Sequence, residues 1–358
     1  WRWVNPSVSD HAMHLHGFYY TVNSVGDAER TTVYGENQRR QVVTAHIASS
    51  GTMALTWVPE RGGNWIFHCH MLAHMSTEAR LGRDKPMHSG ETHDDPADSA
   101  GMGGLVVGIK VTPKPGEEQA EAAPPAQPRK LRLLVRERPA TEQALAGLGF
   151  ELLEGTAEPS GKINVPGAPL VLTRGESVEI TVVNQTRQAT AIHWHGIELE
   201  SYYDGVPGWG GSGRQITPPV ASGGSFVARM TPPRAGTFIY HTHWHDVEQL
   251  TSGLYGPLIV LKPGQKFDSE TDKVFVISRG RLTDEGRPLV VNGKEQPRPV
   301  ELRKGKTYRF RIINITPNDA DATVTLKSGE KIPTWRLVSK DGQDVPPSQA
   351  IVREAKQL

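Results

Sequence analysis

The only cysteine of the chain, Cys69, lies between two histidines, and a third histidine follows soon after. The segment reads W-I-F-H-C-H-M-L-A-H and contains His68, His70 and His74. A thiolate flanked by imidazoles combines soft and borderline ligands, which suits copper or zinc. A buried structural thiol with incidental histidines is the simpler alternative, but three more histidine groups occur along the chain. The segment therefore predicts a metal site.

Histidines also occur in pairs separated by one residue. Because alternate side chains of a strand point to the same face, each His-x-His pair places both imidazoles on one side. A single pair is more typical of a satisfied core pair, whereas four pairs at repeated offsets favour metal binding by about three ions in all. The four pairs are His14/His16, His68/His70, His193/His195 and His241/His243.

The elements that must position these pairs follow from composition and repeats. The 358 residues carry 40 basic and 39 acidic side chains, so charge gives no reason to expect nucleic acid as a partner. No apolar run reaches membrane-spanning length, so no membrane span is expected. Plentiful glycine (37) and proline (27) between short β-rich runs predict an all-β protein built of sandwiches.

An internal repeat supports several related domains. In each copy a strand ends at an asparagine, and the ninth residue after it begins the next motif. The three pairs of positions are Asn5 and His14, Asn184 and His193, and Asn314 and Thr323. Threonines replace both histidines in the third copy, at 323 and 325. We therefore expect two metal-bearing domains and a third that has lost its ligands.

The predicted divisions are a first domain at 1–112, a proline-, alanine- and glutamate-rich linker at 113–130, a second domain at 131–262 and a third at 263–358. Strands that precede the repeat in the second and third domains have no counterpart before Trp1. The third domain also ends sooner after its repeat than the second does. Both terminal domains are thus expected to be incomplete.

The histidine motifs resemble the four copper motifs of multicopper oxidases, a family that includes laccases, bilirubin oxidases and ceruloplasmin. The matching motifs are H-x-x-H-x-H-G from His11, H-C-H-x-x-x-H from His68, H-W-H-G from His193, and H-T-H from His241, followed by G-L-Y-G-P-L-I-V. The resemblance covers nearly the whole chain and implies tandem cupredoxin-like Greek-key β-sandwiches. It also implies extracellular or periplasmic location.

The resemblance implies roles for individual residues. His11, Cys69 and His74 match the ligands of a type 1 copper, and a His2Cys set is the one expected of blue-copper electron transfer. His14 and His193 match the type 2 ligands. The type 3 pair would be held by the remaining six, His16, His68, His70, His195, His241 and His243. Cys69 would then join the type 1 site to both type 3 ions through one short stretch of backbone.

Other residues allow more than one interpretation. Asp204, in Y-D-G-V-P, resembles a family acid that supplies protons near the cluster, but an aspartate before glycine is also a common turn residue. His245 is interpreted as a neighbour of the site or a surface residue. An accessory copper site formed by Met87, His88, His93 and Met102 is an alternative to their being solvated.

The sequence also departs from the family pattern. The usual axial position of the type 1 site holds Ala79, with Met75 and Leu81 nearby. Leu72 stands where many members have an acid. The H-C-H motif also precedes H-W-H-G, the reverse of the order in laccases.

The predicted function is a laccase-like oxidation of phenols, aromatic amines or metal ions, coupled to four-electron reduction of O2 to water at a trinuclear copper cluster. Copper nitrite reductase and a non-catalytic copper-binding or electron-transfer protein are the alternatives. Further domains of the same chain or identical subunits are possible partners, and the cluster could form within or between chains.

Overall fold

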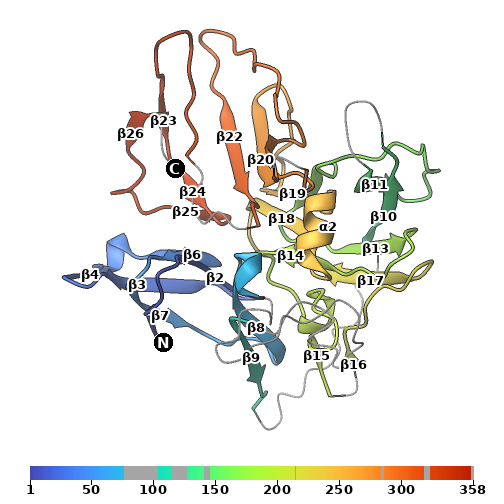
Figure 1. The fold of residues 1–358 in the computed structure, drawn as a ribbon, viewed down its shortest axis with the longest axis horizontal. Helices are drawn as coiled ribbons and strands as arrows, with labels where there is room; N and C mark the ends of the chain where they lie inside the picture. The colour runs from blue at the N-terminus through green and yellow to red at the C-terminus, as the bar shows by residue number, and fades with distance from the viewer. Residues whose placement is uncertain are drawn as a thin grey trace.

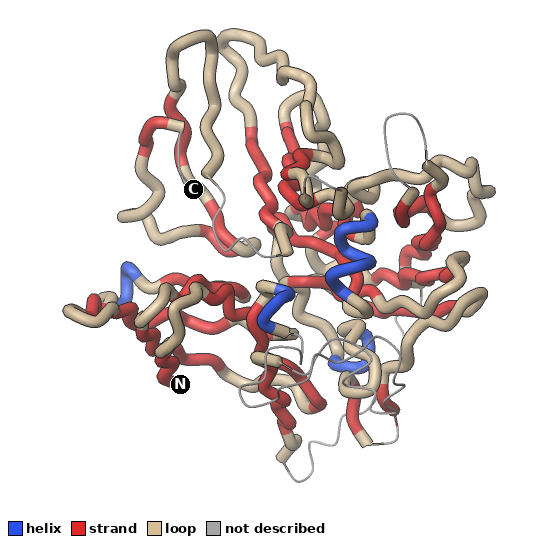
Figure 2. The backbone as a smooth tube through the Cα atoms, viewed as in Figure 1, coloured by secondary structure: helices blue, strands red, loops and turns tan. Residues whose placement is uncertain are grey.

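Strands are the dominant regular element and helices are few and short, which confirms the predicted all-β class (Figures 1 and 2). The computed structural model describes residues 1–75, 104–114, 127–140, 146–213, 215–283, 286–317 and 323–355. Within these ranges the helical elements are short: η1 (Glu36–Gln38), η2 (Leu72–His74), η4 (Ser201–Tyr203) and α2 (Asp246–Ser252). None of the described helices is long and apolar enough to cross a membrane.

Two sheets pack face to face in the first domain. One contains β1 (Arg2–Val4), β7 (Thr52–Trp57), β3 (Tyr20–Gly26), β4 (Thr31–Val33) and β5 (Arg40–Val42). The other contains β6 (Thr44–Ile47), β2 (His11–Leu15), β8 (Gly63–Cys69) and β9 (Val106–Val111). Their facing side chains, including Leu15, Tyr20, Leu55 and Phe67, form one buried core. This core supports the strands that carry the first histidines.

The second domain repeats this arrangement with two four-stranded sheets. The first has the order β11 (Gly147–Glu154), β10 (Arg129–Arg138), β13 (Val178–Asn184) and β17 (Ser225–Met230). The second has the order β12 (Leu170–Thr173), β19 (Tyr255–Leu261), β18 (Gly236–Thr242) and β14 (Ile192–His195). Every second residue of β13 is buried, as expected for a strand with one face on a core.

One hairpin crosses from the second domain to the first. Strands β15 (Gly211–Ser212) and β16 (Gln215–Ile216) extend the sheet of β8, with Gly211 paired to Asn64. The indole Nε1–H of Trp209 donates to the carbonyl of Trp65 at 2.8 Å. The division predicted from the sequence did not anticipate that a hairpin of the second domain joins a sheet of the first. This pairing connects the two domains beside the histidine strands.

The third domain contributes smaller sheets. One sheet has three strands, in the order β21 (Leu289–Val291), β20 (Asp272–Arg279) and β22 (Arg309–Asn314). Two ribbons have two strands each: β23 (Thr334–Arg336) pairs with β26 (Val352–Glu354), and β24 (Ser339–Lys340) pairs with β25 (Gln343–Asp344). A core cluster joins this domain to the others, since it contains Leu72 of the first domain, Leu250 of the second and Ile313 of the third.

The predicted repeat is visible as one recurring turn. In each copy the asparagine side-chain oxygen accepts hydrogen bonds from the backbone N–H and the hydroxyl of the residue two positions on. The pairs are Asn5 and Ser7, Asn184 and Thr186, and Asn314 and Thr316. The side chain fixes the chain exit from each equivalent strand, so the following motif starts from the same geometry.

Candidate metal centre

Strands β2 and β8 separate two groups of possible ligands onto opposite faces. Their register pairs Met13 with Cys69 and His14 with His68. Because paired residues share a face and adjacent residues along a strand point to opposite faces, His11 and Cys69 lie on the core side with Met13. The imidazoles of the pairs His14/His16 and His68/His70 therefore project together from the other side.

Strands β14 and β18 do the same in the second domain. His193 is paired with His241, while Trp194 and Tyr240 are fully buried in the core on the opposite face. His243 follows the end of β18 and donates its backbone N–H to the carbonyl of Ala191. The second domain thus presents two further His-x-His pairs from one surface.

All four pairs converge within the one chain. The Nε2 atoms of His14 and His193 are 3.3 Å apart, and those of His16 and His68 are 2.9 Å apart. Three ligand groups with all candidate atoms within 4.8 Å of one another are His14/His16/His68, His14/His193/His195 and His70/His195/His241. The ring centroid of His243 lies 5.1 Å from that of His16 and 5.6 Å from that of His68.

Hydrogen bonds fix which nitrogen of most rings faces the cluster. The Nδ1–H groups of His14, His68, His193 and His241 donate to backbone carbonyls of Val43, Cys69, Asp204 and Thr242. A ring that donates through Nδ1 keeps its lone pair on Nε2, so these four imidazoles present Nε2 as the ligand atom.

His195 is oriented the other way. Its Nε2 lies 3.2 Å from the hydroxyl of Thr44, and its Nδ1 is buried without a hydrogen-bond partner. Other buried nitrogens of the cluster also lack partners, namely Nε2 of His70, Nε2 of His241 and both ring nitrogens of His243. Buried polar atoms are rarely left unpaired, so this concentration of free nitrogens fits a site for metal ions.

Burial favours the neutral form of seven of these imidazoles. Desolvation first, and repulsion from neighbouring rings second, lower the pKa of the deeply buried histidines well below the usual value. The affected residues are His14, His16, His68, His195, His241 and His243. The pKa of His70 falls to about 4, also chiefly by desolvation. Neutral rings have the free lone pairs that metal binding requires.

A second, smaller group lies on the core side of the same strands. The Sγ of Cys69 is 3.6 Å from Nδ1 of His11 and 3.5 Å from Nδ1 of His74, and these two nitrogens are 3.0 Å apart. His11 contacts the hydroxyl of Ser7 through Nε2, which leaves Nδ1 toward the sulfur. Burial raises the pKa of the Cys69 thiol, so a nearby cation is needed to hold the thiolate at neutral pH.

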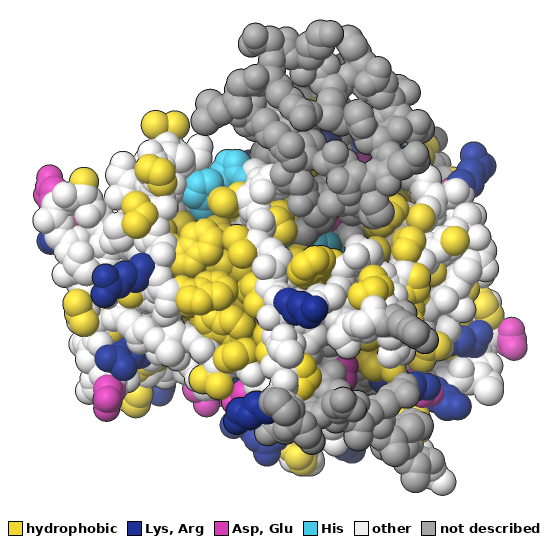
Figure 3. Space-filling view, turned by 90° about the horizontal axis from the view of Figure 1, so that it is seen from below, with side chains coloured by type: hydrophobic (Ala, Val, Ile, Leu, Met, Phe, Trp, Pro, Cys, Tyr) yellow, Lys and Arg dark blue, Asp and Glu magenta, His cyan; other side chains and the backbone are white. Residues whose placement is uncertain are grey.

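The edge of this group is accessible. His11 and His74 are half-buried, whereas Cys69 is fully buried. On one face of the molecule histidine side chains reach the surface next to a patch of hydrophobic side chains (Figure 3). The two imidazoles are thus partly open to solvent, while the thiol is shielded from water.

Asp204 connects the two domains at the larger cluster. Its Oδ2 accepts a hydrogen bond from Nδ1 of His16 at 2.7 Å, its backbone carbonyl accepts one from His193, and its Oδ1 lies 3.4 Å from Nδ1 of His193. The carboxylate is buried. It therefore lies directly behind two imidazoles, one from each domain.

Some residues named from the sequence lie elsewhere. Met75 and Leu72 pack in the core cluster shared by the three domains, apart from the core that contains Cys69. His245 is exposed, and its carbonyl accepts the first backbone hydrogen bonds of α2. The remaining positions, Ala79, Leu81, Met87, His88, His93 and Met102, lie outside the described residues.

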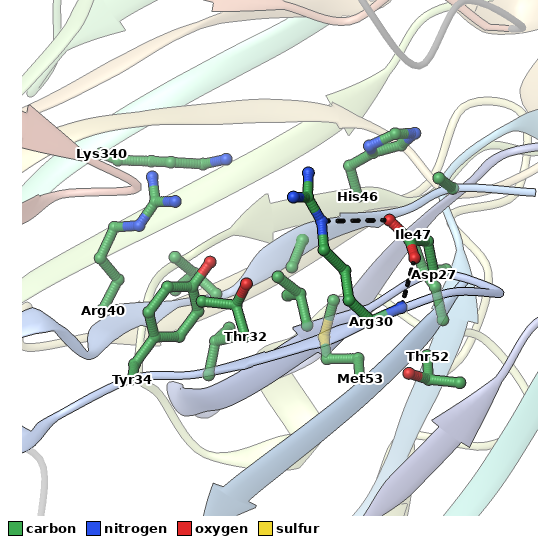
Figure 4. A pocket seen from close by; sticks show the side chains of 16 residues that line it. Asp27, Arg30, Thr32, Tyr34, Arg40, His46, Ile47, Thr52, Met53 and Lys340 are labelled. Atoms are coloured by element: carbon green, nitrogen blue, oxygen red, sulfur yellow. Dashed lines mark hydrogen bonds and ion pairs between the residues drawn. The ribbon is translucent and has the colours of Figure 1, made fainter.

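The sequence did not identify Val43 and Thr44 as contacts of the cluster. They contribute a backbone carbonyl and a hydroxyl that hold His14 and His195, and no motif marks such groups. A separate cavity of about 490 Å³ opens in the first domain, lined by Arg30, Arg40, His46 and Lys340 among others (Figure 4). None of the predicted ligands lines it.

Two models of one family match this chain. Both are described as multicopper oxidase, and they match residues 1–81 and 160–265, together more than half of the chain. Among curated proteins, a copper resistance protein A homolog of Pseudomonas syringae pv. tomato is 34% identical over 162 residues, covering 42% of this chain and 26% of the relative. Laccase-12 of Oryza sativa subsp. japonica is 30% identical over 185 residues, covering 43% and 31%. This chain therefore spans about a quarter to a third of the length of these relatives.

Solved structures give weaker likenesses. A multi-copper oxidase from Pseudomonas thermotolerans has a TM-score of 0.48 at 21% identity, covering 64% of this chain and 56% of that one. Blue copper oxidase from Nitrosomonas europaea has a TM-score of 0.46 at 23% identity, covering 64% and 71%. The family assignment rests on the two sequence models and not on these superpositions. The chain belongs to the multicopper oxidase family.

Proposed function

We propose that this chain carries the copper centres of a laccase-like oxidase, which oxidises a small reductant by single electrons and reduces O2 to water. The observation that supports this most directly is the convergence of eight paired imidazoles from two domains, two of which, His68 and His70, flank Cys69 in the sequence. Phenols, aromatic amines or metal ions are the proposed reductants. An extracellular or periplasmic setting is proposed from the family alone.

The donor sets fit copper. His11, Cys69 and His74 would hold the type 1 ion, and His14 and His193 the type 2 ion. The type 3 pair would be bound by two triplets, His16/His68/His243 and His70/His195/His241. When bound, copper would supply one-electron redox chemistry at the first site and O2 reduction at the other three.

Cys69 couples the two groups. It is bonded through the backbone to both His68 and His70, and its carbonyl accepts the hydrogen bond that orients His68. The sulfur of Cys69 and the imidazole of His68 are thus connected through the Cys69 backbone and the hydrogen bond from Nδ1 of His68 to the Cys69 carbonyl.

Asp204 is proposed to orient His16 and to supply protons near the cluster. Replacing it by asparagine keeps the shape but removes the charge behind His16. Mutating the hydrogen-bond partner of a metal ligand commonly costs about 10- to 100-fold in activity or metal affinity. We expect Asp204→Asn to slow O2 uptake by about that factor, whereas Asp268→Asn, at an exposed turn of the third domain, should leave it unchanged. Equal rates in both variants would contradict this role.

Copper stoichiometry and O2 uptake test the proposal together. The copper-loaded protein should contain about four copper ions per chain and consume about one O2 per four electrons donated. A panel of phenols, aromatic amines and reduced metal ions would identify the reductant class. About two ions with nitrite turnover would favour a nitrite reductase, and about one ion without O2 uptake would favour an electron carrier.

A further inference from the structure

A sharp turn of the third domain contacts Val43 and Thr44, which form the corner between β5 and β6 behind the histidine cluster. Strands β24 and β25 are joined by Asp341 and Gly342, which both have positive φ angles, 50° and 72°. This is the backbone expected of a two-residue hairpin turn. In Figure 1 the β24–β25 ribbon lies next to β6 of the first domain.

The Asp341 carboxylate binds the first domain at a single corner. Its Oδ2 accepts hydrogen bonds from the backbone N–H of Val43 at 3.1 Å and of Thr44 at 3.0 Å. These residues lie where the chain passes from β5 in one sheet to β6 in the other. A charged acceptor shared by two neighbouring N–H groups holds such a corner firmly.

The same corner holds two cluster imidazoles by its other polar groups. The Val43 carbonyl accepts the hydrogen bond from Nδ1 of His14 at 2.9 Å. The Thr44 hydroxyl lies 3.1 Å from that nitrogen and 3.2 Å from Nε2 of His195. His14 and His195 belong to different domains, and their rings stack with centroids 3.7 Å apart. One corner therefore sets the orientation of both rings.

The turn is itself wedged in place. A Cβ on Gly342 would lie 2.4 Å from the ring of Phe238, and one on Gly236 would lie 2.3 Å from the Cα of Gly342. The Tyr19 hydroxyl donates to the Asp341 carbonyl, and Arg234 donates to the Gln343 side chain at 2.9 Å. The turn that carries the carboxylate is thus fixed by contacts with Tyr19 of the first domain and with β18 and Arg234 of the second.

We propose that Asp341 is a positioning residue for the histidine cluster, so that the third domain, which supplies none of the predicted ligands, orients His14 and His195 through the Val43–Thr44 corner. This inference rests on the proposed copper function for its consequence. The link from Asp341 to the corner can be measured without metal.

Two substitutions and one matched control test it. Asp341→Gly removes the carboxylate and tolerates the positive φ. Asp341→Asn also tolerates this backbone and keeps an uncharged acceptor. Gln343→Ala alters the same turn but removes only its contact with Arg234. All are compared by thermal unfolding of the metal-free protein, so that copper effects can be separated from loss of docking.

The first readout is amide exchange in the metal-free protein. Exchange of the Val43 and Thr44 amides, followed by NMR, should speed up in Asp341→Gly, less in Asp341→Asn, and not in Gln343→Ala. Unchanged exchange in Asp341→Gly would overturn the proposal. If that variant does not fold, Asp341→Asn decides, and unchanged exchange there would overturn it equally.

The second readout is copper binding. Affinity for the most weakly held copper, measured by competition with a chelator, should fall about 10- to 100-fold in Asp341→Gly and less in Asp341→Asn. The electron paramagnetic resonance spectrum of the type 2 copper, proposed at His14 and His193, should change. The blue absorption of the Cys69 site should not. An equal loss in Gln343→Ala would show that docking alone matters and would overturn the proposal. If the unaltered protein binds no copper at the cluster, the proposed function fails, while amide exchange still tests the link to Asp341.

Discussion

At the scale of single residues, Cys69 joins two environments. Its side chain is buried in the core of the first domain, and its backbone carbonyl faces the histidine cluster through His68. Both environments meet here because successive side chains of a strand point to opposite faces, so the ring of His68 lies on the face opposite the thiol and still reaches the Cys69 carbonyl. The thiol and the carbonyl can therefore be examined separately by replacing only the side chain.

We predict that Cys69→Ser abolishes the intense blue absorption of the copper-loaded protein and its oxidation of reductants. Serine retains the strand and the carbonyl bonded to His68, so the cluster should keep its copper. Absorption spectra and copper content measure the two effects. A variant that remained blue would refute the assignment of Cys69.

Asp246 is a buried acid whose ionisation should oppose folding. Desolvation raises its pKa from 3.8 to about 8, and its Oδ1 has no hydrogen-bond partner. Because the folded state holds the proton more tightly than the unfolded chain, stability should be greatest below about pH 4 as far as this residue is concerned. The free energy of unfolding should then decrease up to about pH 8, by roughly 4 to 6 kcal/mol in all.

We predict that Asp246→Asn removes this dependence and stabilises the metal-free protein at neutral and alkaline pH. Urea unfolding between pH 5 and pH 9 would measure it. Glu248→Gln, at an exposed position of the same helix, is the control and should leave the slope unchanged. Parallel pH profiles for the unaltered protein and Asp246→Asn would contradict the expectation.

At the scale of elements, the turn after η4 holds the carboxylate behind His16. Gly205 follows Asp204 with φ +84°, and a Cβ there would lie 1.9 Å from the carbonyl oxygen of Ile192, next to His193. The contact atom is backbone, so it cannot move without displacing β14. Only glycine fits this position.

We therefore predict that Gly205→Ala lowers both the free energy of unfolding and the copper content. Gly175→Ala is the matched control, because Gly175 also has positive φ (79°) but no atom within 4 Å of the added Cβ. The control should cost about 1 to 2 kcal/mol from backbone strain alone. Thermal unfolding and metal analysis of both variants measure the difference, and equal losses would show that the clash is relieved.

At the scale of the whole molecule, the cluster is also a joint between domains. His14 and His193 come from different domains, and Asp204 and the β15–β16 hairpin cross the same boundary. Metal bound to both sides should favour the assembled state, because a ligand that binds only the folded form stabilises it by mass action.

We predict that removing copper with a chelator lowers the unfolding temperature. The difference should correspond to about 3 kcal/mol or more when free copper exceeds the dissociation constant about 100-fold. Calorimetry with and without chelator tests this. His193→Ala should lose most of the copper-dependent gain, and Cys69→Ser should keep the part due to the cluster. No change on chelation would indicate that the domains assemble without the metal.

The sequence by itself determined the all-β class, the repeat and the pairing of the histidines. These depend on local rules: side chains alternate along a strand, and an asparagine with Ser or Thr two residues later forms the same turn each time. The His-x-His pairs therefore had to project in twos from their strands. The grouping of His11, Cys69 and His74, in contrast, was implied by the resemblance to multicopper oxidases.

Only the tertiary structure decided how the pairs meet and what holds them. Which ring nitrogen of His195 is free depends on Thr44, and the orientation of His14 depends on the Val43 carbonyl. Met75 could not be placed from sequence because its position depends on packing against α2 and β22. The contact of Asp341 with the corner spans about 300 residues of chain, and no local pattern records a contact between groups so far apart.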